Sequence, residues 1–273
     1  MLRSLNSGVS GLKGFQTKLD VIGNNIANVN TVGFKKGRVV FEDIFSQTVK
    51  SATGPKSNPV TGAPISGGTN PIQVGLGTRV GSIDTVHTPG SPTTTNIGTD
   101  LYLDGDGFFV VQDQAGKSFL TRAGNFKLDS SNQLVNQNGM FVLDQTGNTI
   151  TIPSGFISFA IDQSGAIIGV DVDGNSVDTG MKIGTVAVNN PSGLLKAGGS
   201  LYTLTPNADP QNMAGLLARG SNASIISGAL EMSNVDLSEE LTDMITAQRG
   251  FQANAKIITV SDSILEELVN LKR

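Results

Sequence analysis

The sequence predicts a mainly β protein with an α-helix at each terminus, in which one central β sandwich or barrel-like domain is inserted between two helices that pair as an antiparallel coiled coil. Apolar residues recur every seven positions near both ends, a spacing that keeps one stripe of a helix towards a partner. Between the ends, short apolar runs alternate with Gly- and Asn-containing turns. A strand-rich middle does not readily bury two such stripes. The helices are therefore expected to pair with each other or with those of other copies.

Residues 1–34 are expected to form the N-terminal helix of the coiled-coil core. Glycines at positions 8, 11, 14 and 23 each weaken this helix by about 1 kcal/mol relative to alanine, and they also allow a neighbouring backbone to come close. The helix is therefore expected to be marginal in a lone monomer, and to end near residues 28–33, where Asn and Gly tolerate a left-handed backbone. Its seam comprises Leu5, Leu12, Phe15, Leu19, Ile22 and Ile26.

Residues 35–71 are expected to form an extended arm or linker. Prolines at positions 55, 59, 64 and 71 lie among Ser, Thr and Gly. Such a composition is typical both of an extended arm and of a disordered linker, and composition alone does not separate the two.

Residues 72–227 are expected to form the central β domain. Turn signals occur at close spacing and separate short apolar runs of the kind that form strands. These signals lie at 104–107, 113–116, 136–139, 145–148, 163–165 and 173–175.

Residues 228–273 are expected to contain the C-terminal helix, which pairs with the first. Asp236 suits the N-cap position, and Glu239 three residues later completes a capping pattern. The seam of this helix comprises Leu237, Leu241, Met244, Phe251, Ile258 and Leu265, and a second stripe on another face comprises Ile257, Ile264 and Leu271. Two apolar faces need two sets of partners, one in the same chain and one in another subunit.

Composition argues against several classes of function. Charged residues make up 15% of the chain and the net charge is −4, so no basic face is expected to bind nucleic acid. No segment approaches the roughly 20 apolar residues of a membrane span, so membrane insertion is not expected. Glycines and a lysine interrupt the N-terminal apolar residues, which argues against a cleavable signal peptide. The absence of cysteine argues against a disulfide-stapled secreted domain.

The residues give no convincing catalytic, cofactor or metal site, so an enzyme is not expected. His87 is the only histidine, and its surroundings are typical of a strand end. The run 171–182 begins like a calcium loop but lacks the glycine at its sixth position and the glutamate at its twelfth. The glycines of 75–81 match a dinucleotide fingerprint poorly, because the third comes one residue late.

Four stretches resemble the signatures of the flagellar axial rod and hook proteins. The first is residues 20–35, which read D-V-I-G-N-N-I-A-N-V-N-T-V-G-F-K; the others are 104–109, 121–126 and 228–254. Together they span both helices and the β domain, and their order is specific to this family. The motif residues of the first stretch are Asn25, Ala27, Asn28, Asn30, Thr31, Gly33 and Phe34.

The resemblance implies a structural subunit of the bacterial flagellar hook, which polymerises into a bent helical tube and transmits torque from rod to filament. The runs 12–34, 229–237 and 247–252 are similar to the short hook proteins of Gram-positive bacteria, whereas the single β domain alone would suit a distal rod protein of the basal body. The hook is therefore expected, with the distal rod protein as the alternative. A monomeric β-domain binding module is the alternative from another class.

The implied partners are other copies of the chain, the distal rod protein, the hook cap, the hook–filament junction proteins and the flagellar type III export apparatus. The implied location is the extracellular hook or basal body, reached without a cleavable signal peptide.

Overall fold

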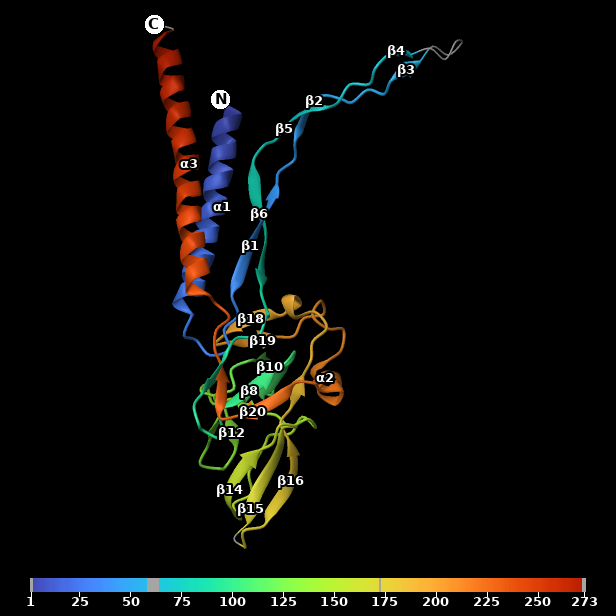
Figure 1. Ribbon diagram of the computed structural model, residues 1–273, viewed down its shortest axis with the longest axis vertical. Helices are drawn as coiled ribbons and strands as arrows, with labels where there is room; N and C mark the ends of the chain where they lie inside the picture. The colour runs from blue at the N-terminus through green and yellow to red at the C-terminus, as the bar shows by residue number, and fades with distance from the viewer. Residues whose placement is uncertain (1, 58–63, 172, 272–273) are drawn as a thin grey trace. The chain divides into compact units, whose positions relative to one another are not determined.

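The computed structural model describes residues 2–57, 64–171 and 173–271, and shows a mainly β chain with a long α-helix at each end (Figure 1). Helix α1 spans Leu2–Ala27, the short α2 spans Met213–Arg219, and α3 spans Leu237–Asn270. The predicted fold class, mainly β with terminal helices, is confirmed at this level.

The chain divides into two compact units. The helix–ribbon unit comprises Met1–Asn24, Gly37–Asp84 and Ser238–Arg273. The β unit comprises Asn25–Lys36 and Thr85–Leu237. The chain therefore passes between the two units four times.

Six strands of the helix–ribbon unit form an antiparallel ribbon. Strand β1 pairs with β6, β2 with β5 and β3 with β4, and the three pairs follow one another along the ribbon (Figure 1). A bridge between Thr53 and Thr69 continues the pairing between the second and third pairs. The strands are β1 (Gly37–Asp43), β2 (Gln47–Lys50), β3 (Lys56–Ser57), β4 (Pro64–Ser66), β5 (Ile72–Val74) and β6 (Thr78–Thr85).

The segment 50–71, for which the sequence left a linker and an extended arm open, is thus extended and paired in its described part. Residues 58–63, Pro59 among them, lie outside the described residues. The strands at 72–74 and 78–85, expected in the central β domain, pair with the strands of this ribbon instead.

Strand β9 (Phe108–Gln112) lies at the centre of the largest sheet and is buried on both faces. Phe109 and Val111 belong to one hydrophobic core, and Phe108 and Val110 belong to a second. All four side chains are at most 3% exposed. Successive side chains of a strand point to opposite faces, so burial on both faces explains why this run is continuously apolar.

The largest sheet has the order β11–β12–β13–β9–β10–β19–β18, and β17 also pairs with β9. Its members besides β9 are β10 (Ser118–Thr121), β11 (Lys127–Leu128), β12 (Leu134–Val135), β13 (Phe141–Val142), β17 (Thr185–Val186), β18 (Leu195–Gly198) and β19 (Leu201–Thr203). A 3₁₀ turn at Pro191–Gly193 precedes β18. The described residues form no closed barrel, and the expected sandwich is not confirmed.

Three smaller sheets complete the β unit. One joins β14 (Phe156–Ile161), β15 (Ala166–Asp171) and β16 (Ser176–Lys182). The others pair β7 (Pro92–Thr94) with β21 (Ala229–Glu231), and β8 (Leu101–Asp104) with β20 (Ser224–Ser227). The predicted turns lie between these strands. In the turn from β9 to β10, for example, Gly116 has a φ of 80° and its amide donates to the Asp113 carbonyl.

Candidate assembly surfaces

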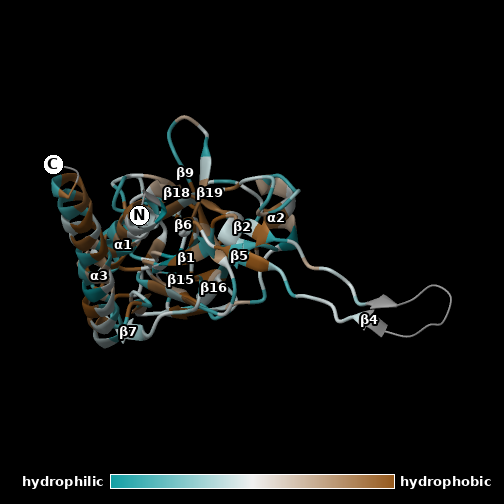
Figure 2. Ribbon diagram, turned by 90° about the horizontal axis from the view of Figure 1, so that it is seen from above, coloured by the Kyte–Doolittle hydropathy of each residue, from teal (hydrophilic) through white to brown (hydrophobic). Residues whose placement is uncertain are grey.

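Helices α1 and α3 contact each other through faces that contain glycine. A Cβ atom at Gly8 would lie 3.3 Å from the Ile258 side chain, and one at Gly11 would lie 3.0 Å from the Asn254 amide. The two helices lie side by side in Figures 1 and 2. The α1 glycines therefore allow close packing against α3.

The next contacts along α1 fix its direction relative to α3. The Phe15 ring packs against Gly250, and Lys18 Nζ pairs with Asp243 at 3.2 Å. Contact positions thus rise along α1 as they fall along α3, which makes the two helices antiparallel. Winding of the pair into a coiled coil stays a prediction.

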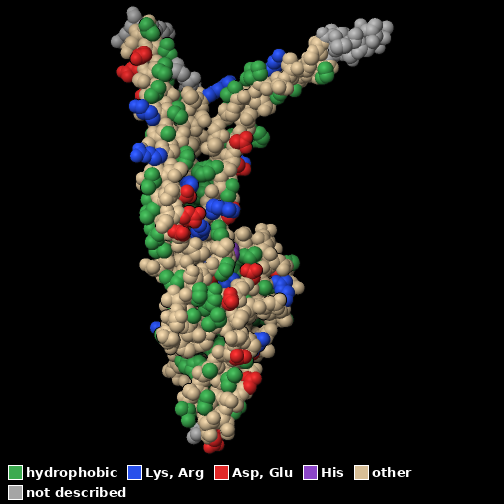
Figure 3. All heavy atoms as spheres, in the orientation of Figure 1, with side chains coloured by type: hydrophobic (Ala, Val, Ile, Leu, Met, Phe, Trp, Pro, Cys, Tyr) green, Lys and Arg blue, Asp and Glu red, His purple; other side chains and the backbone are tan. Residues whose placement is uncertain are grey.

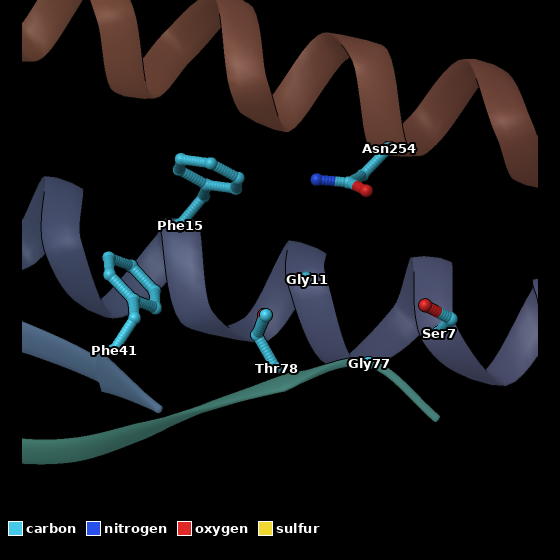
Figure 4. Close-up of a pocket in the computed structure, with 7 residues that line it drawn as sticks. All are labelled: Ser7, Gly11, Phe15, Phe41, Gly77, Thr78 and Asn254. Carbon is cyan, nitrogen blue, oxygen red and sulfur yellow. The ribbon is translucent and has the colours of Figure 1, made fainter. Parts of the chain in front are cut away.

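A cavity of about 280 Å³ opens between α1, α3 and the ribbon (Figure 4). Phe15 points into it from α1, and the Phe41 ring lies next to Phe15 with 5.7 Å between the ring centroids. A Cβ at Gly14 would lie 2.8 Å from the Phe41 ring, so this glycine lets the ribbon approach the helix. The lining residues are Ser7, Gly11, Phe15, Phe41, Gly77, Thr78 and Asn254.

Gly23 differs from these glycines, because a Cβ there would have nothing within 4 Å apart from its chain neighbours and the backbone of its own helix. We expect Gly23→Ala to stabilise α1 by about 0.5–1 kcal/mol, since only the backbone flexibility of glycine is lost. Gly250→Ala should destabilise the helix pair, because the new Cβ would lie 2.5 Å from the Phe15 ring. Thermal unfolding followed at the helical circular dichroism signal compares the two variants. Equal effects would contradict the assigned contacts.

The seam residues predicted on α1 are all buried or half-buried. Ile22 is buried, and half-buried positions are Leu5, Leu12, Phe15, Leu19 and Ile26. On α3, Met244, Ile258 and Leu265 are half-buried, whereas the exposed seam residues are Leu237, Leu241 and Phe251. Of the motif residues, Asn25 and Gly33 are buried, Asn28, Thr31 and Phe34 are half-buried, and Ala27 and Asn30 are exposed.

The second stripe of α3 is exposed along the helix. Ile257, Ile264 and Leu271 are 45%, 41% and 82% exposed. Val260 and Leu268 lie on the same face at helical spacing and are also exposed. Figure 3 shows hydrophobic side chains gathered along this helix. Contiguous exposed apolar surface of this kind marks interaction sites.

The ribbon also exposes apolar side chains. Phe45 is 90% exposed, Val49 64% and Ile72 54%. A two-stranded ribbon has little core of its own and is marginally stable alone in water. Both the ribbon and the second stripe of α3 are therefore candidate assembly surfaces.

A buried charge cluster lies in the β unit. Lys35 and Glu231 are fully buried and Arg122 is 3% exposed. Lys35 Nζ lies 2.5 Å from one Glu231 carboxylate oxygen, and Arg122 lies 3.4 Å from the other. Burial lowers the pKa of Lys35 from its ordinary value, and the Glu231 carboxylate opposes this shift.

Backbone groups complete the cluster. Lys35 Nζ also donates to the Thr88 carbonyl at 2.7 Å, and the Gly90 amide donates to Glu231 at 2.9 Å. Arg122 donates to the carbonyls of Leu103 at 3.1 Å and Gly105 at 2.7 Å. Such extra hydrogen bonds are what a buried ion pair needs to offset the loss of hydration.

This cluster was not predicted from the sequence, although the sequence contains a signal of it. Lys35, Arg122 and Glu231 each lie in a different one of the four motif stretches. One charged residue in each of three motifs is consistent with a shared site. The composition of the motifs does not show, however, that these three side chains are buried together.

His87 lies beside the cluster. Its ring packs against Phe108 and Tyr202, with centroids 5.7 Å and 5.4 Å away. Burial lowers the pKa of His87 to about 4, and the positive charges of Lys35, Lys196 and Arg122 act in the same direction. The structure thus holds this imidazole neutral at pH 7, in agreement with a structural role.

This lowered pKa predicts acid sensitivity. The unfolded chain binds a proton at His87 near pH 6.5, whereas the folded chain does so near pH 4, so folding stability falls as the pH is lowered through this window. Urea unfolding between pH 7 and 4 measures this loss, and His87→Gln should lack this part of the pH dependence. Parallel curves for both chains would rule the assignment out.

Comparison with known proteins identifies the family. Residues 5–35 match the family described as "Flagella basal body rod protein", 102–169 match "Flagellar hook protein FlgE/F/G D1 domain", and 226–271 match "Flagellar basal body rod FlgEFG protein C-terminal". The chain is 51% identical over 273 residues to the flagellar basal-body rod protein FlgG of Bacillus subtilis, and the match covers 100% of both chains. The chain belongs to the family of flagellar rod and hook proteins.

Two further relatives are a rod protein and a hook protein. The flagellar basal-body rod protein FlgG of Borreliella burgdorferi is 36% identical over 278 residues, and the flagellar hook protein FlgE of the same organism is 31% identical over 454 residues. Each match covers 100% of both chains. Members of this family are structural proteins of the flagellar axial structure. Within the described residues, none of the helices has the length and apolar character needed to cross a membrane.

Proposed function

We propose that the chain is a distal rod subunit of the flagellar basal body, which polymerises with other copies of itself. The observation that supports this best is the 51% identity, over the full length of both chains, to the rod protein FlgG. The hook relative is aligned over 454 residues, well beyond the 273 residues of this chain. The rod thus has better support than the hook that the sequence motifs favoured.

The exposed surfaces suit a polymer better than a monomeric binding module. The seam residues Leu237, Leu241 and Phe251 and the second stripe of α3 remain exposed in one chain. A second copy would bury this apolar surface, and a contact that does not close into a ring would extend into a helical tube. In this proposal the terminal helices pair as a coiled coil at the core of the tube.

Electron microscopy of polymers grown from the purified protein tests the proposal. A rod subunit should give straight, rigid tubes, whereas a hook subunit should give curved ones. A chain that stays monomeric in sedimentation at high concentration would remove both readings and favour the binding module. The hook cap, the junction proteins and the export apparatus stay predictions as partners.

The ribbon is proposed to set the packing between copies. We expect deletion of residues 52–68 to loosen or prevent the tubes, because it removes β3 and β4 and with them any contact of this part of the ribbon with a neighbouring copy. Thermal unfolding of the monomer should change little, since a ribbon of this kind adds little stability to one chain. Tubes with wild-type geometry and stiffness would show that the segment is only a linker.

A further inference from the structure

The charge cluster lies where the chain leaves α1 and where it enters α3. Lys35 comes shortly after α1, which ends at Ala27, and Glu231 shortly before α3, which begins at Leu237. Their ion pair is reinforced by the amide of Gly33, which donates to the Glu231 carbonyl at 2.9 Å. The segment that follows α1 and the segment that precedes α3, which we call the roots of the two helices, are therefore bonded to each other within the β unit.

Asn234 adds a second set of bonds between the same segments. Its Oδ1 atom accepts from the Lys36 amide at 2.8 Å, and its Nδ2 atom donates to the Val86 carbonyl at 2.9 Å. The Val86 amide in turn donates to the Lys36 carbonyl at 2.9 Å. We call the five residues Lys35, Lys36, Val86, Glu231 and Asn234 the clasp.

The hairpin of β18 and β19 holds the same segment from another side. Ser200 Oγ donates to the Val32 carbonyl at 3.3 Å. Lys196 Nζ donates to the Lys35 carbonyl at 3.1 Å and lies 5.0 Å from the centre of the Phe34 ring. Gly33 fits closely there, because its φ is 67° and a Cβ would lie 2.6 Å from the Ala123 amide nitrogen. All these contacts lie within the β unit.

We propose that the clasp holds the roots of α1 and α3 together in the folded β unit, so that the two helices pair as the arms of a preformed hairpin. The inference rests on the proposed function, which makes helix pairing a step of assembly. Starting a helix is costly, and the four glycines of α1 add to the cost. Tethering raises the effective concentration of two segments to the millimolar range without any new contact between them.

Hydrogen exchange in the full-length monomer provides the first test. The amides of Gly33, Lys36 and Val86 should exchange as slowly as that of Val110 in β9, whatever the exchange of the helices. In Asn234→Ala, protection at Lys36 and Val86 should fall at least tenfold while Val110 is unchanged, because the partly buried hydrogen bonds of the Asn234 side chain to the Lys36 amide and the Val86 carbonyl are lost. Fast exchange of the clasp amides in the wild type would overturn the proposal.

Polymer growth from preformed seeds provides the second test. Asn234→Ala should slow growth at least tenfold, whereas the control Asn148→Ala, in an exposed turn of the same unit, should grow within twofold of the wild type. Growth of Asn234→Ala at the wild-type rate, with the clasp amides already unprotected, would overturn the proposal.

Two further comparisons keep these tests decisive. If Asn234→Ala fails to fold, Ser200→Ala takes its place, because it removes only the hydrogen bond from Ser200 to the Val32 carbonyl. This variant should slow polymer growth about threefold. Unchanged growth would contradict the proposal. If the wild type forms no polymer, the proposed function fails. The helix content of Asn234→Ala and Asn148→Ala, compared by circular dichroism, then decides the clasp: lower content in Asn234→Ala alone supports it, and equal content overturns it.

Discussion

Replacing Glu231 by glutamine is expected to destabilise the β unit by about 3–5 kcal/mol. The substitution keeps the shape of the side chain but leaves Lys35 and Arg122 buried without a negative partner. An uncompensated buried charge is far more costly than the loss of an exposed ion pair. Urea unfolding followed at the β-sheet circular dichroism signal measures the effect.

Glu42→Gln is the matched control. Glu42 pairs with Arg79 at 2.6 Å, close to the distance in the buried pair, but both side chains are exposed. Water screens such a pair, so the control should lose no more than about 1 kcal/mol. A small effect of Glu231→Gln, similar to that of the control, would show that the cluster contributes little to stability.

Phe251→Asp is expected to abolish polymerisation while the monomer remains folded. Phe251 is 37% exposed on α3, so a carboxylate there meets water in the single chain. In the proposed tube a second copy covers this position, and burying an unpaired carboxylate would cost several kcal/mol. Sedimentation and electron microscopy measure assembly, and near-ultraviolet circular dichroism reports the folded state of the β unit.

Gln252→Asp adds the same charge at the next position, which lies on a different face of the helix and is also exposed. It should polymerise much more readily than Phe251→Asp. Normal tubes from Phe251→Asp would remove this residue from the interface. Equal loss in both variants would point to charge on α3 in general.

Local patterns predicted the elements that depend on local chemistry. Heptad spacing and the Asp236 capping pattern indicated both terminal helices, and α3 begins at Leu237 directly after Asp236. Glycine-containing turns were found because backbone conformation at single residues selects glycine. These signals lie within a few residues of the structure that they specify.

Features that depend on distant pairing were not predicted. The ribbon joins residues 37–57 to residues 64–85, and composition around the prolines gives no information about that register. The spacing of apolar residues on α3 also does not predict which partner, α1 or another copy of the chain, covers each of its two apolar stripes. The face that contacts α1 includes Gly250 and Asn254, whereas Phe251 is exposed.

The four passages of the chain between the two units affect how the protein can be shortened. The β unit consists of two separate pieces of sequence, and its smaller piece, Asn25–Lys36, directly follows the N-terminal helix. A truncation that begins after residue 36 would therefore discard Lys35 together with the helix, and the remaining chain would keep Glu231 without that lysine. Its poor folding would then be mistaken for a requirement for the helix. A truncation that begins at Asn25 and ends at Leu237 keeps both pieces, and separates the role of the helices from the stability of the sheet.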